Sequence, residues 1–370
     1  MRIACPKEIK PQEYRVGLTP ESAAELVRAD HEVIVETGAG EGVGAGDDLY
    51  QRVGARIAPN AAETFAAGEL IVKVKEPSGD EIARLRPDQT LFTYLHLAPD
   101  PAQAEALLRS GATAIAYETV TDAEGRLPLL KPMSEVAGRM AIQVGANFLE
   151  KSHGGRGVLL GGVPGVRAAD VVILGAGVAG YNAAQIAVGM RARVTVFDKN
   201  VARLEELDRE FTGRLETLYS TRAAVEAAVA EADLVIGAVL IPGAAAPKLV
   251  TRAMLKTMRP GAVLVDISID QGGCFETSRP TTHDKPVFTV DGVLHYCVAN
   301  MPGAVARTSA FALNNVTLPF ALALANKGLR QALRDDPHLA NGLNVAEGGV
   351  AHPAVAAALG KPLKRPDWLG

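Results

Sequence analysis

The feature that most constrains this chain is a glycine-rich turn directly after a run of branched apolar residues. Val171–Leu174 (VVIL) is typical of a buried strand, and it continues into Gly175–Gly180 (GAGVAG). An alanine-rich helical pattern follows over 183–187. A strand that turns into a helix on G-x-G-x-x-G is the context in which this pattern indicates a dinucleotide-binding turn. The sequence therefore predicts a Rossmann-like α/β domain.

Each glycine of the turn has a distinct expected role. Gly175 permits the tight turn, Gly177 lets a pyrophosphate approach the backbone, and Gly180 lets the helix pack closely on the strand. The first N–H groups of the helix lack partners within it, so a phosphate is stabilised there. The next strand, 193–197, ends on Asp198, at the place where an acid binds the ribose hydroxyls. Because this carboxylate would repel a 2′-phosphate, NAD is favoured over NADP.

Length and composition exclude several classes of protein. A chain of 370 residues is too long for one core and predicts two domains. The net charge of −4, without a basic block, argues against nucleic acid as a partner. No signal peptide is apparent, and no apolar run is expected to reach membrane-spanning length. Cys5, Cys274 and Cys297 have no metal-ligand spacing, which indicates reduced thiols, no metal site and a cytoplasmic location.

Residues 1–128 are expected to form a first domain in which short strands alternate with helices. Thr19 and Pro20 mark the N-cap and the first position of a helix. Strands separated by helices predict a parallel, doubly wound sheet. The expected strands are Arg2–Cys5, His31–Glu36, Leu70–Val74, Thr90–Leu95 and Thr113–Tyr117.

Three unusual polar residues follow strands of this first domain. Arg15 lies in the loop after the first strand, Lys75 follows the third, and His96 follows the fourth. Sites in open α/β sheets form outside the carboxyl ends of strands, so these side chains could clamp a small carboxylate beside an acid/base. Each also has a plainer interpretation: a solvated loop charge for Arg15, a surface charge for Lys75 and a structural histidine for His96.

Residues 129–305 are expected to form the second domain, which carries the nucleotide turn. A long amphipathic helix over 129–150 is predicted to bridge the two domains. Ser134 near its start either caps this helix or contacts the cofactor. The glycine-rich stretch 154–165 is interpreted as a flexible crossover, because no Walker lysine follows it.

Three further strands of the second domain are expected to end in loops beside the nucleotide turn. These strands are predicted over 232–239, 261–268 and 293–298. Asp270 follows the second of them and would lie near the nicotinamide, although spacing alone favours a turn-forming aspartate before two glycines. Residues 306–370 are expected to be helices that return to the first domain. The predicted fold class is α/β, with two Rossmann-like, doubly wound parallel-sheet domains separated by a cleft and linked by long helices.

These residues stand in blocks that resemble the L-alanine dehydrogenase family over essentially the whole chain. The blocks are 6–8 (PKE), 13–16 (EYRV), 72–77 (VKVKEP), 92–97 (FTYLHL), 132–138 (PMSEVAG), 175–180 (GAGVAG), 266–273 (DISIDQGG) and 300–303 (NMPG). The resemblance implies NAD-dependent, reversible oxidative deamination of L-alanine to pyruvate and ammonia by a homohexamer. It also implies Arg15 and Lys75 on the substrate carboxylate, His96 as acid/base and Asp270 beside the reacting carbon.

The resemblance implies NAD contacts beyond the glycines of the turn. One position departs from the family pattern: Arg203 stands where a lysine is expected, which keeps the positive charge but changes its contact. The expected NAD-binding residues are Ser134, Gly175, Gly177, Val178, Ala179, Gly180, Asp198, Arg203, Ser220, Val239, Leu240, Ile267, Ser268, Ile269, Asp270, Arg279, Val298, Ala299, Asn300 and Met301.

Other functions share part of this pattern. The NAD-binding subunit of a proton-translocating transhydrogenase would keep the fold and the nucleotide turn, but it needs no amino-acid site. A non-catalytic NAD sensor would also keep the turn and could lose His96. A saccharopine- or opine-type dehydrogenase would need a larger pocket. The set of Arg15, Lys75, His96 and Asp270 argues against the transhydrogenase subunit.

Overall fold

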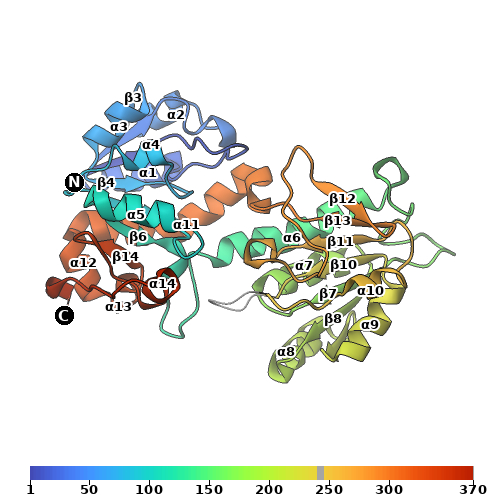
Figure 1. Ribbon diagram of the computed structural model, residues 1–370. Helices are drawn as coiled ribbons and strands as arrows, with labels where there is room; N and C mark the ends of the chain where they lie inside the picture. The colour runs from blue at the N-terminus through green and yellow to red at the C-terminus, as the bar shows by residue number, and fades with distance from the viewer. Residues whose placement is uncertain (240–245, 370) are drawn as a thin grey trace. The chain divides into compact units, whose positions relative to one another are not determined.

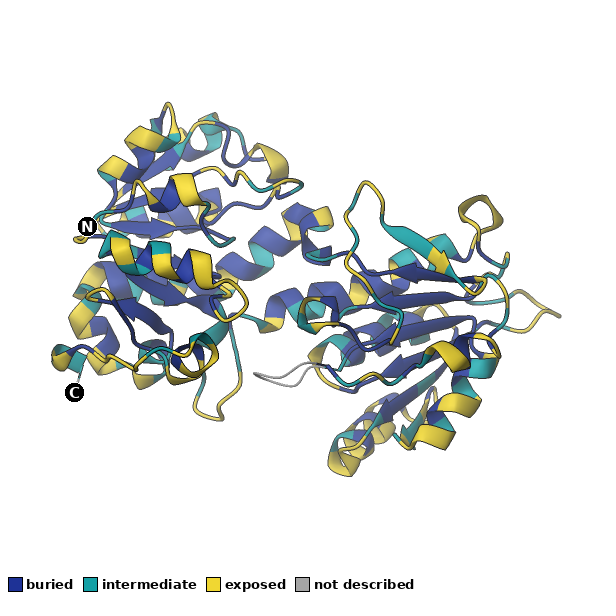
Figure 2. Cartoon of the chain, viewed as in Figure 1, coloured by how far each residue is buried: buried dark blue, intermediate teal, exposed yellow. Residues whose placement is uncertain are grey.

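The computed structural model describes residues 1–239 and 246–369, which form two compact units (Figure 1). Unit 1 comprises Met1–Met133 and Gly303–Gly370, and unit 2 comprises Ser134–Pro302. Each unit is built on one sheet with helices packed against it. In both units most strands are largely buried, while exposed residues lie mainly on helix surfaces, loops and edge strands (Figure 2). The C-terminal segment thus belongs to the same unit as the N-terminal one.

The sheet of unit 1 has the strand order β15-β14-β6-β5-β4-β1-β2-β3, and β1 to β6 pair in parallel. Its strands are β1 (Arg2–Cys5), β2 (Glu32–Glu36), β3 (Arg56–Ala58), β4 (Leu70–Val72), β5 (Thr90–Thr93), β6 (Thr113–Ala116), β14 (Leu343–Ala346) and β15 (Gly349–Val350). The order changes direction between β1 and β4, the type of position where ligands bind in open α/β sheets. The five strands expected in this unit are confirmed, with carboxyl ends up to two residues earlier.

The helices of unit 1 begin with α1, whose start agrees with the sequence prediction. Thr19 is its N-cap, and the Thr19 hydroxyl accepts a hydrogen bond from the Ser22 N–H at 3.3 Å. The helices are α1 (Pro20–Arg28), α2 (Asp47–Arg52), α3 (Ala61–Ala67), α4 (Gly79–Ile82), α5 (Pro101–Ser110), α11 (Ala306–Lys327), α12 (Leu329–Asp335), α13 (Pro337–Ala340) and α14 (Pro353–Leu359).

The expectation that residues after 305 are only helical is wrong. β14 pairs antiparallel with β6, and β15 pairs antiparallel with β14, so the C-terminal segment extends the sheet itself. These strands are short and follow strongly helical sequence. β14 pairs with β6, more than 200 residues earlier in the chain, and β15 pairs with the adjacent β14, so both owe their strand conformation to pairing onto the sheet. β3 was also not predicted, because three residues are too few to show a strand period.

The expectation that no apolar run reaches membrane-spanning length is also wrong. The stretch Met301–Lys327, which includes α11, is long and apolar enough by length and composition. Its residues Ala310, Leu313 and Leu324 are buried in the hydrophobic core of unit 1. Asn314 is buried too, and its side chain accepts a hydrogen bond from the Thr19 N–H at 2.9 Å. The buried residues of α11 therefore contribute to the core of unit 1.

The sheet of unit 2 has the order β12-β13-β11-β10-β7-β8-β9, in which only β12 pairs antiparallel among the described strands. Its strands are β7 (Asp170–Leu174), β8 (Arg193–Asp198), β9 (Glu216–Tyr219), β10 (Leu234–Gly237), β11 (Val263–Asp266), β12 (Val287–Val290) and β13 (Val293–Tyr296). Its helices are α7 (Val178–Gly189), α8 (Val201–Phe211), α9 (Arg222–Glu231) and α10 (Arg252–Leu255), and α6 (Lys131–Phe148) enters it from unit 1. The order changes direction between β7 and β10. The α/β fold class is confirmed, but both sheets are mixed at one edge.

Candidate functional site

The predicted nucleotide turn lies between β7 and α7, at the point where the strand order of unit 2 changes direction. Gly175 has φ +103°, and a Cβ there would lie 2.8 Å from the Ala238 carbonyl oxygen. Gly177 is the N-cap of α7 and receives no side-chain capping bond, and a Cβ at this position would meet nothing within 4 Å. The helix thus presents its first N–H groups beside open space, which fits a bound phosphate.

Gly180 is the tightest position of this turn. A Cβ at Gly180 would lie 1.8 Å from the Gly175 carbonyl oxygen, a backbone atom that cannot swing aside. Gly189 lies at the other end of α7, and a Cβ there meets nothing within 4 Å. Gly180 therefore sets the approach of α7 to β7, as predicted for the third glycine of the turn.

Substitution of these two glycines by alanine is expected to change the free energy of unfolding in different directions. Gly180→Ala is expected to lower the free energy of unfolding by about 1–3 kcal/mol, because overpacking against backbone displaces α7. Gly189→Ala is expected to leave the stability unchanged or raise it by up to about 1 kcal/mol, since alanine favours the helix. Chemical denaturation of both variants, followed by circular dichroism, measures the difference. Equal stability of the two variants would contradict the packing role of Gly180.

Asp198 and Arg203 hold the peptide of Ala176 in the turn from two sides. The Asp198 carboxylate accepts hydrogen bonds from the Ala176 N–H at 2.7 Å and the Asn200 N–H at 2.8 Å. The Arg203 guanidinium donates to the Ala176 carbonyl oxygen at 2.8 Å and pairs with Glu206 at 2.6 Å. A carboxylate has about four acceptor positions, so two remain for ribose hydroxyls. The arginine thus has a defined contact in the turn.

The other predicted NAD-binding residues lie mainly at the carboxyl ends of the parallel strands of unit 2. Ser220 follows β9, Val239 follows β10, residues 267–270 follow β11, and residues 298–301 follow β13. Because these strands are parallel, their ends share one edge with the nucleotide turn. Leu240 lies outside the described residues. Two predicted residues have other positions: Arg279 lies over the Phe288 ring, 4.3 Å from its centroid, and Ser134 lies on α6.

Ser134 does not cap α6. The helix begins at Lys131, three residues earlier, so Ser134 lies within its first turn. Of the two interpretations of this serine, the cap is therefore wrong. Contact with a cofactor stays a prediction.

Arg15, Lys75 and His96 follow β1, β4 and β5, which are neighbours in the sheet of unit 1. The three side chains therefore belong to the loops along one edge of that sheet. Asp270 belongs to unit 2, where it lies exposed in the short 3-10 turn Ile269–Gln271.

Arg15 is not a solvated loop charge, because only 3% of it is exposed. Its Nε and Nη2 donate to the two carboxylate oxygens of Glu13 at 2.7 and 2.6 Å, and its Nη1 lies 3.1 Å from the Met133 sulfur. Burial alone would lower the pKa of Arg15, but the bonds to Glu13 raise it above its ordinary value. The guanidinium is a rigid, permanently charged group held at the edge of the sheet.

Lys73 and Lys75 have different roles although they are two residues apart. Lys73 is fully buried and pairs with Glu8 at 3.2 Å and Glu81 at 2.7 Å, so it is a structural cation. Lys75 is partly exposed, and its ammonium is 3.8 Å from Glu76. Glu8 also accepts the N–H of Lys75 at 3.3 Å, which fixes the backbone from which this side chain projects.

His96 is not a buried structural histidine. Its side chain is 44% exposed, and its backbone is left-handed with φ +48°, which is uncommon for a residue other than glycine. The Glu118 carboxylate accepts the His96 N–H at 2.6 Å and lies 3.9 Å from the ring Nδ1. The imidazole also stacks on Tyr94, with ring centroids 5.8 Å apart. Glu118 and Tyr94 thus hold the ring in place.

Sequence reasoning gave Glu118 no role. It follows β6 at the carboxyl end of the sheet, so the rule that identified Lys75 and His96 applied to it as well. Glu13, the partner of Arg15, lies in the block 13–16 that resembles the family, but no role is predicted for it. Both residues contact a predicted site residue, which spacing alone does not reveal.

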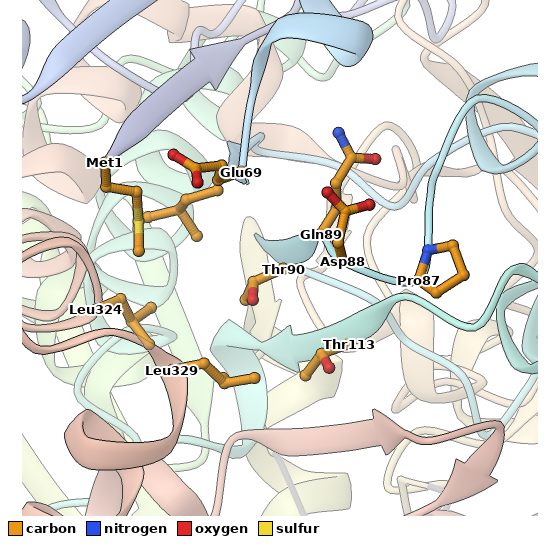
Figure 3. Close-up of a pocket in the computed structure, with 10 residues that line it drawn as sticks. Met1, Glu69, Pro87, Asp88, Gln89, Thr90, Thr113, Leu324 and Leu329 are labelled. Atoms are coloured by element: carbon orange, nitrogen blue, oxygen red, sulfur yellow. The ribbon is translucent and has the colours of Figure 1, made fainter.

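Two other features bear on ligand chemistry. A hollow in unit 1 lies at the amino ends of β1, β4, β5 and β6, the opposite edge from Arg15, Lys75 and His96 (Figure 3). Its lining includes Met1, Glu69, Gln89, Thr90 and Thr113. No group of three or more His, Cys, Asp or Glu side chains that could hold a metal ion occurs within residues 1–239 and 246–369.

Comparison with known proteins places this geometry among nucleotide-dependent enzymes. The family model for the N-terminal domain of alanine dehydrogenase/PNT matches residues 4–137, and the model for the C-terminal domain matches residues 141–353. The chain is 61% identical over 360 residues to an alanine dehydrogenase of Halomonas elongata, with 97% of each chain covered.

Solved structures give the same result. An L-alanine dehydrogenase structure has a TM-score of 0.95 and 54% identity, covering 97% of this chain and 99% of that one. A transhydrogenase structure from Sinorhizobium meliloti has a TM-score of 0.81 and 27% identity, covering 96% of this chain and 100% of that one. The similarity to the dehydrogenase is thus the stronger of the two in both sequence and structure.

Proposed function

Because the chain belongs to the alanine dehydrogenase/PNT family, we propose that it catalyses the NAD-dependent, reversible oxidative deamination of L-alanine to pyruvate and ammonia. The observation that carries the proposal is the set of Arg15, Lys75 and His96 in loops that follow neighbouring strands of unit 1, in a chain whose unit 2 has a nucleotide turn. In this proposal, unit 1 binds the substrate and unit 2 binds the cofactor.

NAD fits the residues of unit 2. The exposed Gly177 and the uncapped start of α7 suit the pyrophosphate, and Asp198 suits the ribose hydroxyls while disfavouring a 2′-phosphate. When bound, the nicotinamide supplies the site that accepts a hydride from the substrate. The loop after β11 contributes Asp270 to the same edge of unit 2.

The cations of unit 1 hold and orient the substrate. In this proposal Arg15 and Lys75 bind the carboxylate of the amino acid, which turns a bimolecular encounter into an oriented step. Arg15 can serve as a fixed anchor because Glu13 restrains its guanidinium. Lys75 is the more exposed of the two and is the adjustable contact.

His96 then acts as the acid/base of the reaction. After loss of the hydride the substrate is an iminium, which water attacks. Neutral His96 takes a proton from that water and returns one to the nitrogen as the carbinolamine collapses to pyruvate and ammonia. The proposal requires Asp270 to stabilise the cationic intermediate, an effect that grows when water is excluded. The Glu118 carboxylate, which accepts the His96 N–H and lies 3.9 Å from Nδ1, would orient the ring for these transfers.

A substrate and cofactor panel tests the proposed function. The full-length protein is incubated at alkaline pH with NAD⁺ or NADP⁺ and a series of L-amino acids, and NAD(P)H absorbance is followed. We expect the highest rate with L-alanine and NAD⁺. Turnover of only a longer amino acid would favour a saccharopine- or opine-type activity. NADH binding without turnover of any amino acid would favour the transhydrogenase-subunit or sensor alternative and contradict the proposal.

The proposal extends to the assembly and location of the protein. A homohexamer is proposed from the family resemblance, and sedimentation analysis of the purified protein would measure the subunit number. A cytoplasmic location is proposed because Cys5, Cys274 and Cys297 are all free and buried thiols. The small-molecule partners would be L-alanine, pyruvate and ammonia.

A further inference from the structure

A buried carboxylate with no assigned role stands at the carboxyl end of β11. Asp266 is 0% exposed and is the last residue of that strand. Its two oxygens accept hydrogen bonds from the Ser268 N–H at 3.1 Å, the Cys274 N–H at 2.9 Å and the Ser278 hydroxyl. All three donors come from the segment just after the strand. Asp266 is thus the centre around which residues 267–278 fold.

This segment carries the residues proposed to act on the cofactor and the substrate. Ser268, one donor to Asp266, accepts hydrogen bonds at its carbonyl from the Gln271 and Gly273 N–H groups. These bonds close the short turn that contains Asp270. The Ser268 hydroxyl also donates to the Val239 carbonyl oxygen at 2.7 Å, which ties this segment to the loop after β10. The position of Asp270 therefore depends on a turn anchored to Asp266.

The chain leaves space for the Asp266 carboxylate at one glycine. Gly273 has φ +78°, and a Cβ there would lie 2.5 Å from Asp266 Oδ2. Glycine at this position thus serves both the backbone conformation and the approach of the carboxylate.

A second group holds the same segment from outside. The Lys248 ammonium donates to the carbonyl oxygens of Gly272 and Gly273, the latter at 2.9 Å. The Ala246 N–H donates to the Gln271 carbonyl oxygen at 3.0 Å. The loop with Asp270 is therefore held by a buried anion on one side and a more exposed cation on the other.

We infer that Asp266 is a positioning residue, which fixes the Asp270 turn and the NAD-binding residues 267–269 through the donors that converge on its carboxylate. The inference rests on the proposed function for the role of Asp270. Each donor needs an acceptor, and the ionised carboxylate supplies acceptors only. Burial raises the pKa of Asp266, while the Ser278, Cys274 and Ser268 donors oppose that shift. An asparagine would turn an NH₂ group toward at least one donor and open the turn.

Asp233 provides a matched control in the same unit. It is also a buried carboxylate, 4% exposed, and it accepts the Asp170 N–H at 2.9 Å and pairs with Arg156 at 3.1 Å. It lies directly before β10 begins, so it stands at the amino edge of the sheet, opposite to Asp266. A general loss of stability would lower NADH affinity and kcat in both variants. A loss of positioning would lower them only in Asp266→Asn.

The experiment compares wild type, Asp266→Asn and Asp233→Asn by thermal unfolding, NADH titration and steady-state kinetics. For Asp266→Asn we expect the Kd for NADH to rise about 10-fold or more, as when a buried donor loses its acceptor. We expect kcat to fall about 10²-fold, because Asp270 is misplaced. The KM for L-alanine should stay within about twofold, because Arg15 and Lys75 belong to unit 1. Asp233→Asn should keep both NADH affinity and kcat within about twofold, whatever its melting temperature.

Several outcomes would overturn the inference. The inference is wrong if Asp266→Asn has an NADH affinity and a kcat close to those of wild type. It is also wrong if Asp266→Asn and Asp233→Asn lose NADH affinity and kcat to the same extent. If Asp266→Asn does not fold, the variants Ser278→Ala and Lys248→Met test the inference instead. Each removes the hydrogen bonds of one side chain that holds the segment and leaves the other contacts in place. Each should raise the Kd for NADH at least about threefold, and unchanged binding in both would overturn the inference. If wild type fails to oxidise L-alanine, the proposed function fails, but the NADH titrations still test the positioning role.

Discussion

His96→Ala is expected to lower kcat for L-alanine oxidation at least about 10³-fold, because acid/base catalysis by a positioned side chain contributes about 10²–10⁴-fold. NADH should still bind with a Kd within about twofold of wild type, since the nucleotide turn belongs to unit 2. Stopped-flow or steady-state absorbance of NADH measures the rate, and fluorescence titration measures the binding. Stability should change little, because the imidazole is 44% exposed.

His153→Ala is the matched control for this prediction. The His153 side chain is 40% exposed and lies 3.7 Å from Glu150, so it has nearly the same exposure and the same kind of acidic neighbour as His96. It lies in a short 3-10 turn of unit 2, and it is not among the predicted site residues. Its removal should leave kcat within about twofold. A near-normal rate for His96→Ala, or an equal loss in both variants, would contradict the assigned role.

Lys75→Met is expected to lower kcat/KM for L-alanine by about 10–10²-fold, because one charge-assisted hydrogen bond to the substrate is lost. Its partner Glu76 would keep Lys10, so the carboxylate is not left without a cation. The KM for NAD⁺ should stay near the wild-type value. Initial rates over a matrix of L-alanine and NAD⁺ concentrations separate the two effects.

Lys10→Met is the matched control for Lys75→Met. Both ammonium groups pair with the Glu76 carboxylate, and together they lower the pKa of Glu76 although burial alone would raise it. Lys10→Met removes the other cation from the same carboxylate, so it reproduces any indirect effect through Glu76. Its kcat/KM for L-alanine should stay within about threefold. Comparable losses in both variants would show that Lys75 acts through Glu76 and not on the substrate.

The nucleotide turn could be predicted in detail because its geometry is local. Gly175 has the positive φ of the tight turn, Gly177 leaves open space at the start of α7, and Gly180 allows close packing against the turn. The strand and the helix on either side are indicated by their own hydrophobic patterns. The start of α1 at Thr19 and Pro20 could be predicted for the same reason. The start of α1 depends on residues within a few positions of each other, whereas the turn at Gly175 also fits against the Ala238 carbonyl.

The edge of unit 1 that carries Arg15, Lys75 and His96 could be predicted with one further rule. Parallel strands place their carboxyl ends together, so strand order along the chain already indicates which loops share an edge. The prediction did not require any contact to be known. The strand prediction failed at β14, which pairs with β6 more than 200 residues earlier, and at β15, a two-residue strand that pairs with β14.

The sequence by itself thus determined the class of fold, the nucleotide turn and the identity of the charged residues at the strand ends, because these follow from local conformation and chain direction. Only the tertiary structure decided what each charged group does. It buried Lys73 between Glu8 and Glu81 while leaving Lys75 partly exposed, and it gathered the donors of residues 268–278 around Asp266. The physical reason is that the role of a charge depends on its burial and its partners, which are set by packing between segments distant in the chain.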